Sequence, residues 1–123
     1  MKGKGSGVVK TVSMNCNQDF RRLYRKEAQV GSVLVTYFSK NRLAYRRVGI
    51  TASKKIGKAH ERNRARRVIR EAYRLLEPQL LTDYGVDIVF VARTKTCLCS
   101  MQEVYRVMKR QLAPYLKKDE KDH

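Results

Sequence analysis

The chain has 123 residues and carries 28 Lys and Arg against 11 Asp and Glu, a formal net charge of +17. A balance this basic indicates a polyanionic partner, either nucleic acid or an anionic membrane surface. No apolar run approaches the ~18 residues of a membrane-spanning helix, and the first residues lack the apolar core of a signal peptide. The composition therefore predicts a cytoplasmic protein without a membrane partner.

The two ends of the chain differ in composition from its middle. Residues 1–13 are rich in Gly, Lys and Ser without an apolar period, and residues 117–123 are charged throughout. We predict a flexible basic tail over 1–13, a single domain over 14–116 and a charged C-terminal tail over 117–123. The hydrophobic residues, 42% of the chain, are sufficient for one core.

The first predicted element is a short amphipathic helix over residues 17–27. Phe20, Leu23 and Tyr24 fall at i, i+3 and i+4, and Asn17 precedes them as a candidate helix cap. This spacing places the three side chains on one face of the helix. The helix is therefore expected to bury one face against the rest of the domain.

Strands and a last helix follow from the pattern further along the chain. Residues 33–38 and 46–53 have the alternation of a strand, and residues 87–93 form a near-continuous apolar run that is typical of a buried strand. Ser100 and Glu103 form a capping box that opens the final helix. Its core stripe consists of four apolar residues: Val104, Val107, Met108 and Leu112.

Residues 53–74, SKKIGKAHERNRARRVIREAYR, hold nine Lys or Arg and only two carboxylates, Glu61 and Glu71. On a helical wheel the apolar side chains gather in one arc of roughly 100°. They are Ala65, Val68, Ile69, Ala72 and Leu76. Six further residues fall within about 140° on the flank and far side: Arg62, Asn63, Arg66, Arg67, Arg70 and Arg74. The segment is thus predicted to be a helix with one buried face and one basic face.

The basic face has almost no acidic partners, unlike a solvated helix that alternates Lys or Arg with Glu. Arg outnumbers Lys on it, and a guanidinium can bind phosphate bidentately, which favours nucleic acid over lipid. Lys54, Lys55 and Lys58 extend the same charge into the turn before the helix. A merely solubilising face is the alternative, but solubility requires far less charge than this.

Metal chemistry finds little support in the sequence. Cys16, Cys97 and Cys99 give no pairing framework, and one residue between Cys97 and Cys99 is the wrong spacing for a zinc knuckle. We interpret all three as reduced thiols. His60 has no Cys or second His at ligand spacing, so it is predicted to contact phosphate or cap the helix.

Residues 47–74, RVGITASKKIGKAHERNRARRVIREAYR, resemble the signature of the bacterial ribonuclease P protein subunit. That pattern is a strand, Ser-Lys-Lys, Gly-x-Ala and then Arg-Asn-x-x-(Lys/Arg)-Arg-x-x-Arg on a helix. Upstream, DFRRLYRKE and VLVTYFSKN are similar to the family's first helix and first long strand, and downstream DIVFVAR is similar to its buried strand. The resemblance covers roughly residues 17–115 and is specific in its central block.

The resemblance implies an α+β fold, a single α/β sandwich domain of the ribosomal protein S5 domain 2-like type with a mixed central sheet. Its elements would follow in the order helix, short strand near residues 29–31, two longer strands, basic helix, strand and helix. It also implies a left-handed crossover around the basic helix, against the strong right-handed preference of such connections. The residue pattern alone does not predict that hand.

The resemblance also implies two binding surfaces. The face for the catalytic RNA would consist of Lys54, Lys55, Lys58, Arg62, Asn63, Arg64, Arg66, Arg67 and Arg70. The cleft for the 5′ leader of precursor tRNA would include Phe20, Tyr24 and Tyr37. Aromatic rings next to cations are what single-stranded nucleic acid requires. Core packing is the alternative for Phe20, whereas the hydroxyl of Tyr37 favours a wet edge.

The function expected from the resemblance is that of a ribonucleoprotein subunit that assists removal of the leader. The chain offers no histidine pair and no carboxylate cluster for phosphodiester hydrolysis, so no catalytic residue is assigned to it. Catalysis and most Mg²⁺ binding are expected in the partner RNA, and the protein alone is expected to be inactive. A ribosomal or general RNA-binding protein is the alternative. A DNA-binding helix-turn-helix is disfavoured because the basic helix follows a strand.

Overall fold

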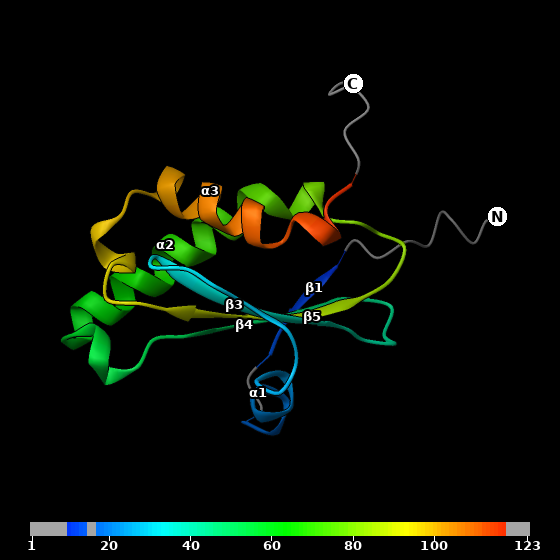
Figure 1. The fold of residues 1–123 in the computed structure, drawn as a ribbon, viewed down its shortest axis with the longest axis horizontal. Coiled ribbons are helices and arrows are strands. Elements are labelled where there is room, and N and C mark those ends of the chain that lie inside the picture. Colours follow the sequence, from blue (N-terminus) through cyan, green and yellow to red (C-terminus); the bar gives the residue numbers. More distant parts are fainter. Residues whose placement is uncertain (1–9, 15–16, 118–123) are drawn as a thin grey trace.

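The computed structural model describes residues 10–14 and 17–117, and these form one α+β domain with three α-helices and a five-stranded mixed sheet (Figure 1). The strands are β1 (Thr11–Ser13), β2 (Ala28–Val30), β3 (Leu34–Lys40), β4 (Arg46–Thr51) and β5 (Val86–Ala92). The helices are α1 (Asn17–Leu23), α2 (Ala59–Leu76) and α3 (Met101–Gln111). The predicted fold class is confirmed, and so is the predicted order of helices and strands from α1 onward.

The strand order brings distant parts of the chain together. It runs β1-β4-β5-β3-β2, so β5 lies at the centre of the sheet although it is the last strand in sequence. β5 pairs parallel with β4 and antiparallel with β3. α2 therefore lies in the crossover between two neighbouring parallel strands. The left hand of this crossover, which the family resemblance implies, stays a prediction.

The helices lie on both faces of the sheet. α2 and α3 cover one face, and α1 lies on the other (Figure 1). Because side chains alternate along a strand, Ile88 and Phe90 of β5 belong to the main core with α2 and α3, whereas Val89 packs with Met14 and Leu23 under α1. The two cores are thus divided by the central strand.

The buried arc predicted for the basic helix is confirmed in α2. All five arc residues, from Ala65 to Leu76, are buried in the main core, and Tyr73 is a further buried side chain. The Glu61 side chain caps the helix, since its Oε1 accepts a 2.7 Å hydrogen bond from the Lys58 backbone N–H. The helix therefore has a fixed start and a fixed buried face, which together determine where its arginines point.

α3 begins at the predicted capping box. Ser100 Oγ accepts a hydrogen bond from the Glu103 backbone N–H at 3.2 Å, and the Glu103 carboxylate accepts one from the Ser100 N–H at 3.0 Å. Three of the four predicted stripe residues are fully buried, whereas Val107 is partly buried. The local pattern thus predicted both the start and the buried face of this helix.

The first helix is shorter than predicted. It was expected over residues 17–27, but α1 ends at Leu23. Residues 28–30 pair with β3 as strand β2, and the Glu27 carbonyl already accepts a hydrogen bond from the Phe38 N–H. Pairing with the sheet satisfies these backbone groups, so the helix cannot continue through them.

The predicted extent of the N-terminal tail is wrong at its last residues. Thr11–Ser13 do not belong to a flexible tail, because they form β1 and pair parallel with β4 from Arg46 to Val48. A three-residue edge strand is too short to show an apolar period, which explains the error. Residues 1–9, and the C-terminal tail beyond Lys117, lie outside the described residues.

Candidate nucleic-acid interface

The residues predicted to bind RNA share one surface. Lys54 and Lys55 lie in a 3₁₀ turn after β4, and Lys58 immediately precedes α2. Of the nine predicted residues, seven are exposed, and Arg62 and Arg66 are partly buried. The structure therefore places them on the turn and around the outer side of one helix, outside its apolar arc, with Arg64 directed to Cys97.

Three arginines of this surface are held in place by backbone carbonyls. The contacts are Arg62 Nη1 to Gly57 O at 2.9 Å, Arg64 Nε to Cys97 O at 2.8 Å and Arg66 Nη2 to Ala52 O at 3.4 Å. A guanidinium has five N–H donors, so each of these groups retains donors for a phosphate. The side chains of Arg67 and Arg70 make no hydrogen bond or ion pair with any described residue. The surface thus combines pre-oriented arginines with projecting ones.

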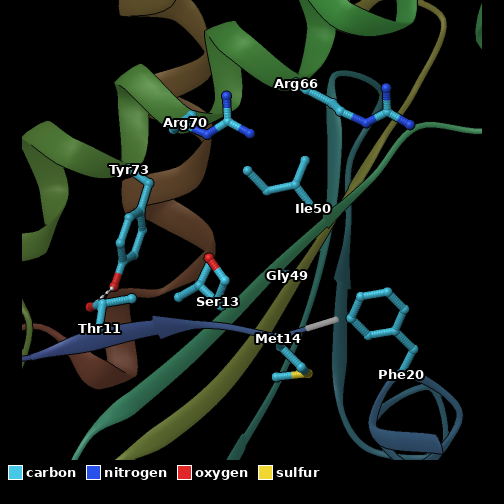
Figure 2. A pocket seen from close by; sticks show the side chains of 10 residues that line it. Thr11, Ser13, Met14, Phe20, Gly49, Ile50, Arg66, Arg70 and Tyr73 are labelled. Atoms are coloured by element: carbon cyan, nitrogen blue, oxygen red, sulfur yellow. Dashed lines mark hydrogen bonds between the residues drawn. The ribbon is translucent and has the colours of Figure 1, made fainter. Parts of the chain in front are cut away.

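A cavity of about 330 Å³ opens at the sheet edge beside β1 and β4 (Figure 2). Arg66 and Arg70 of α2 border it from one side, and Phe20 of α1 lies at the other. Its wall includes Tyr73, whose hydroxyl lies 3.0 Å from Thr11 Oγ1. The cavity offers two guanidinium groups for a phosphate and an aromatic ring for a base. Residues predicted for the RNA face and for the leader cleft therefore meet in one cavity.

The three aromatic residues predicted for the leader cleft lie on the α1 side of the sheet. Phe20 is partly buried against Gly49, where an added Cβ would lie 2.5 Å from Phe20 Cε1, so glycine is required for this contact. Tyr24 and Tyr37 meet edge to face, with ring centroids 4.8 Å apart. Tyr24 is 42% exposed. Phe20 thus packs against the sheet and also borders a cavity. Its position is therefore compatible with both alternatives considered for it, core packing and the leader cleft.

Strand register arranges the α1 face of the sheet in three rows. The first row is Arg47, Asp87 and Ser39, the second is Gly49, Val89 and Tyr37, and the third is Thr51, Val91 and Val35. α1 lies across the second row, because its Phe20 contacts Gly49 and its Leu23 packs with Val89. The first and third rows are therefore on opposite sides of α1.

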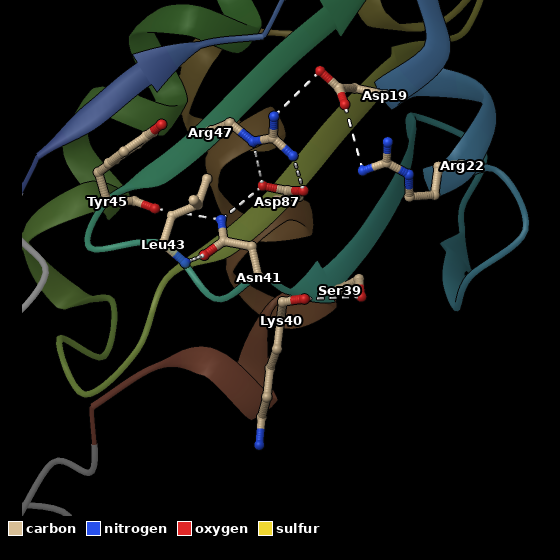
Figure 3. Close-up of polar contacts among 9 residues, drawn as sticks. All are labelled: Asp19, Arg22, Ser39, Lys40, Asn41, Leu43, Tyr45, Arg47 and Asp87. Carbon is tan, nitrogen blue, oxygen red and sulfur yellow. Dashed lines mark hydrogen bonds and ion pairs between the residues drawn. The ribbon is translucent and has the colours of Figure 1, made fainter.

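The first row contains an ionic network that ties α1 to the sheet (Figure 3). Arg47 Nε and Nη2 donate to the two oxygens of Asp87 at 2.8 and 2.6 Å, and Nη1 donates to Asp19 Oδ2 at 3.2 Å. The hydrogen bond to Asp87 raises the pKa of Arg47 against the opposing effect of burial. Asn41 Nδ2 also donates to Asp87, at 2.7 Å. Since Asp19 directly precedes Phe20, the network helps to fix the aromatic ring.

The candidate metal ligands are dispersed. Cys97 and Cys99 are free and buried, and Cys16 lies outside the described residues. His60 is exposed in the first turn of α2, and the cap of that turn is Glu61. Among the residues that the structure describes, no three His, Cys, Asp or Glu side chains are grouped as metal ligands. Within residues 10–14 and 17–117, no helix has the length and apolar character needed to cross a membrane.

The Arg47 network is the main feature that sequence reasoning missed. Asp87 stands at the start of a buried strand and is only 8% exposed. A carboxylate in an apolar run requires a buried partner, and this requirement was the available signal. Nothing in the local pattern identified Asp19 and Arg47 as the groups that meet it, because they belong to other elements.

The fold and the interface define an α+β protein with a basic helix face near a cavity and a pair of contacting tyrosines. The family model described as ribonuclease P matches residues 9–116, and the chain belongs to this family. The ribonuclease P protein component of Clostridioides difficile is 40% identical over 101 residues, which cover 81% of this chain and 88% of the relative. That of a Thermoanaerobacter species is 41% identical over 87 residues, 70% of this chain and 73% of the relative.

Solved structures give the same result for the fold. The ribonuclease P protein of Staphylococcus aureus superposes with a TM-score of 0.72 at 27% identity, covering 85% of this chain and 95% of that one. The ribonuclease P protein of Thermotoga maritima superposes with a TM-score of 0.68 at 26% identity, covering 80% and 92%. The family resemblance inferred from the basic block is thereby confirmed.

Proposed function

We propose that this protein is the protein subunit of a ribonuclease P holoenzyme that removes the 5′ leader from precursor tRNA. In this role α2 and the preceding turn bind the catalytic RNA, and the cleft beside α1 binds the leader. Membership of the ribonuclease P family supports the role. The free thiols of Cys97 and Cys99 are typical of a reducing compartment, which supports action in the cytoplasm.

The observation that carries the proposal is the cavity shared by Arg66, Arg70 and Phe20. A single RNA strand needs cations for its phosphates and rings for its bases. At this sheet edge Arg66 and Arg70 on one side and Phe20 on the other line the same cavity, across the edge formed by β1 and β4 (Figure 2). A leader that leaves the catalytic RNA at α2 can therefore pass directly into the aromatic cleft.

The protein contributes cations to the reaction, and the described residues hold no group of carboxylates that fits a resident magnesium ion. Asp19 and Asp87 are both bound by Arg47, and Glu61 caps α2. Magnesium prefers carboxylates that are open to it, together with water and phosphate oxygens. We propose that the Mg²⁺ of the reaction is held mainly by RNA phosphates. The protein then acts by screening repulsion between phosphates and by holding substrate.

Reconstitution tests this proposal. The purified protein should not cleave precursor tRNA, whereas the ribonuclease P RNA from the same genome should cleave it at high Mg²⁺. Adding the protein should lower the Mg²⁺ concentration needed and tighten substrate binding, because α2 and the cleft supply positive charge. The readout is cleavage at the mature 5′ end over a Mg²⁺ titration. Cleavage by nuclease-free protein without RNA, lost in His60→Ala, would overturn the assignment of catalysis to RNA.

Tyr37→Ala should weaken binding of leader-bearing precursor tRNA by about 1–3 kcal/mol if a base stacks on the ring. Binding of mature tRNA should hardly change, since it has no leader. The measurement is the dissociation constant of each tRNA for the reconstituted particle. Tyr105→Ala is the matched control, because it removes a partly buried tyrosine from α3 on the opposite face of the sheet. Equal losses on both tRNAs would assign Tyr37 to packing alone.

The same titrations separate the proposal from a general RNA-binding role. A general binder should hold unrelated structured RNAs with similar affinity at matched salt. A ribonuclease P subunit should prefer the ribonuclease P RNA and should improve capture of precursor over mature tRNA. Failure of both preferences would favour the general role.

A further inference from the structure

A second basic surface lies on the side of α1 away from the third row. A cavity of about 340 Å³ is bordered there by α1, by the loop between β3 and β4, and by the first row of the sheet. Besides Lys40, three exposed cations stand around it: Arg22, Lys26 and Arg42. We call this cavity and its cations the α1 groove.

The carboxylates of the α1 groove are already neutralised. Asp87 is held by two hydrogen bonds from Arg47, and Asp19 receives Arg47 at 3.2 Å and Arg22 at 3.5 Å. Lys26 and Arg42 make no ion pair with any described residue. With Arg47 included, the cations outnumber the carboxylates by two, so the groove keeps a positive potential.

Lys40 also borders the α1 groove but does not add its charge there. Its Nζ lies 4.6 Å from the centroid of the Tyr84 ring, a cation–π contact. Figure 3 shows the side chain directed away from the Arg47 network. The positive potential of the groove therefore comes from α1 and from the loop.

The leader cleft and the α1 groove are separate. α1 lies across the second row of the sheet, with Phe20 over Gly49 and Tyr24 against Tyr37. The groove lies at the first row, where Arg47 and Asp87 are paired. The cavity beside Phe20 is lined by β4 from Val48 to Ile50 and by Arg66 and Arg70, and none of these residues borders the groove.

The α1 groove also differs from the cleft in chemistry. No aromatic side chain borders it among the described residues, whereas three aromatic residues are predicted for the leader cleft. Cations without rings suit the sugar–phosphate backbone, because base recognition by stacking requires an aromatic face. No residue of α2 borders the groove, because Arg66 and Arg70 line the other cavity, beside Phe20.

We propose that the α1 groove binds the sugar–phosphate backbone of the ribonuclease P RNA, at a place separate from the contact made by α2. This inference rests on the proposed function, because it assigns the groove to the RNA of the same particle. The protein then engages that RNA from both faces of its sheet. The leader remains on the aromatic side of α1.

Two double variants of α1 and the turn after it test the proposal. Arg22→Ala with Lys26→Ala removes two exposed cations of the groove. Arg21→Ala with Arg25→Ala removes two exposed cations that do not border it and that directly follow Phe20 and Tyr24. Both doubles lower the net charge equally. Affinity for the ribonuclease P RNA from the same genome is measured without tRNA over a salt series, and precursor tRNA is then added to the particle.

The groove double should reduce the log–log salt slope for RNA binding by about 1.5, since each phosphate contact contributes roughly 0.7 to 0.9. Arg42→Ala alone should reduce it by about 0.8. The Arg21 and Arg25 double should leave this slope nearly unchanged and should weaken capture of leader-bearing tRNA. Thermal unfolding of each variant checks that the fold is intact. Arg42→Ala tests the groove independently of α1, because Arg42 lies in the loop between β3 and β4.

Three results would overturn the proposal. They are an unchanged slope in the groove variants, the same loss in both doubles, and a loss that appears only when leader-bearing tRNA is present. The first result would mean that the RNA binds elsewhere on the protein. The second would mean that the loss of affinity follows from net charge alone. The third would mean that the groove binds the leader. Failure of the wild-type protein to prefer this RNA would instead refute the proposed function, so the two failures are distinguishable.

Discussion

Replacing Arg66, Arg67 and Arg70 together by alanine should weaken binding of the ribonuclease P RNA about a hundredfold near 0.1 M salt. Each lost phosphate contact lowers the log–log salt slope by roughly 0.7, so three remove about 2. The affinities of variant and wild type should then converge toward about 1 M salt, where condensed counterions no longer favour release. The fold should survive because all three lie outside the buried arc of α2.

The measurement is a set of equilibrium titrations at several salt concentrations. A triple variant of α3, Arg106→Ala with Lys109→Ala and Arg110→Ala, is the control because it removes three exposed cations from another helix. It should lose less affinity and keep more of the slope. A slope that is unchanged in the α2 triple, or lowered equally in both triples, would mean that α2 is not the principal RNA contact.

Asp87→Ala should lower the free energy of unfolding by about 3 kcal/mol, which is the scale for removing one partner of a buried ion pair. The substitution leaves the Arg47 guanidinium, whose side chain is 20% exposed, without the carboxylate that it binds most closely. It also removes the acceptor of Asn41 Nδ2. Because Arg47 also binds Asp19, the loss should loosen α1 and reduce leader binding more than RNA binding.

Urea unfolding measures this loss, and Asp83→Ala is the matched control. Asp83 is exposed, so its removal should change stability by no more than about 0.5 kcal/mol. If Asp87→Ala costs less than about 1 kcal/mol, the pair behaves as an exposed salt bridge and does not anchor α1. A leader affinity that falls in parallel with RNA affinity would argue against a specific effect on α1.

The sequence by itself determined the parts of this protein whose cause is local. The apolar arc of α2, from Ala65 to Leu76, follows from a period of 3.6 residues, and the exposed arginines then follow by exclusion. The capping box of Ser100 and Glu103 is complete within four residues, so it was also readable. The basic block, residues 47–74, is contiguous as well. The family resemblance could therefore be recognised from it, and that resemblance led to the correct fold class.

The tertiary structure alone decided the features that join distant segments. Arg47 meets Asp19 and Asp87, which are 28 and 40 residues away, only because β5 is placed beside β4 and α1 is laid across the same face. Phe20 reaches Gly49 for the same reason. No periodicity encodes such partners, because strand order and register are set by the packing of the whole sheet. The cavity at α2, the separation of the leader cleft from the α1 groove, and the edge strand β1 all depend on that packing.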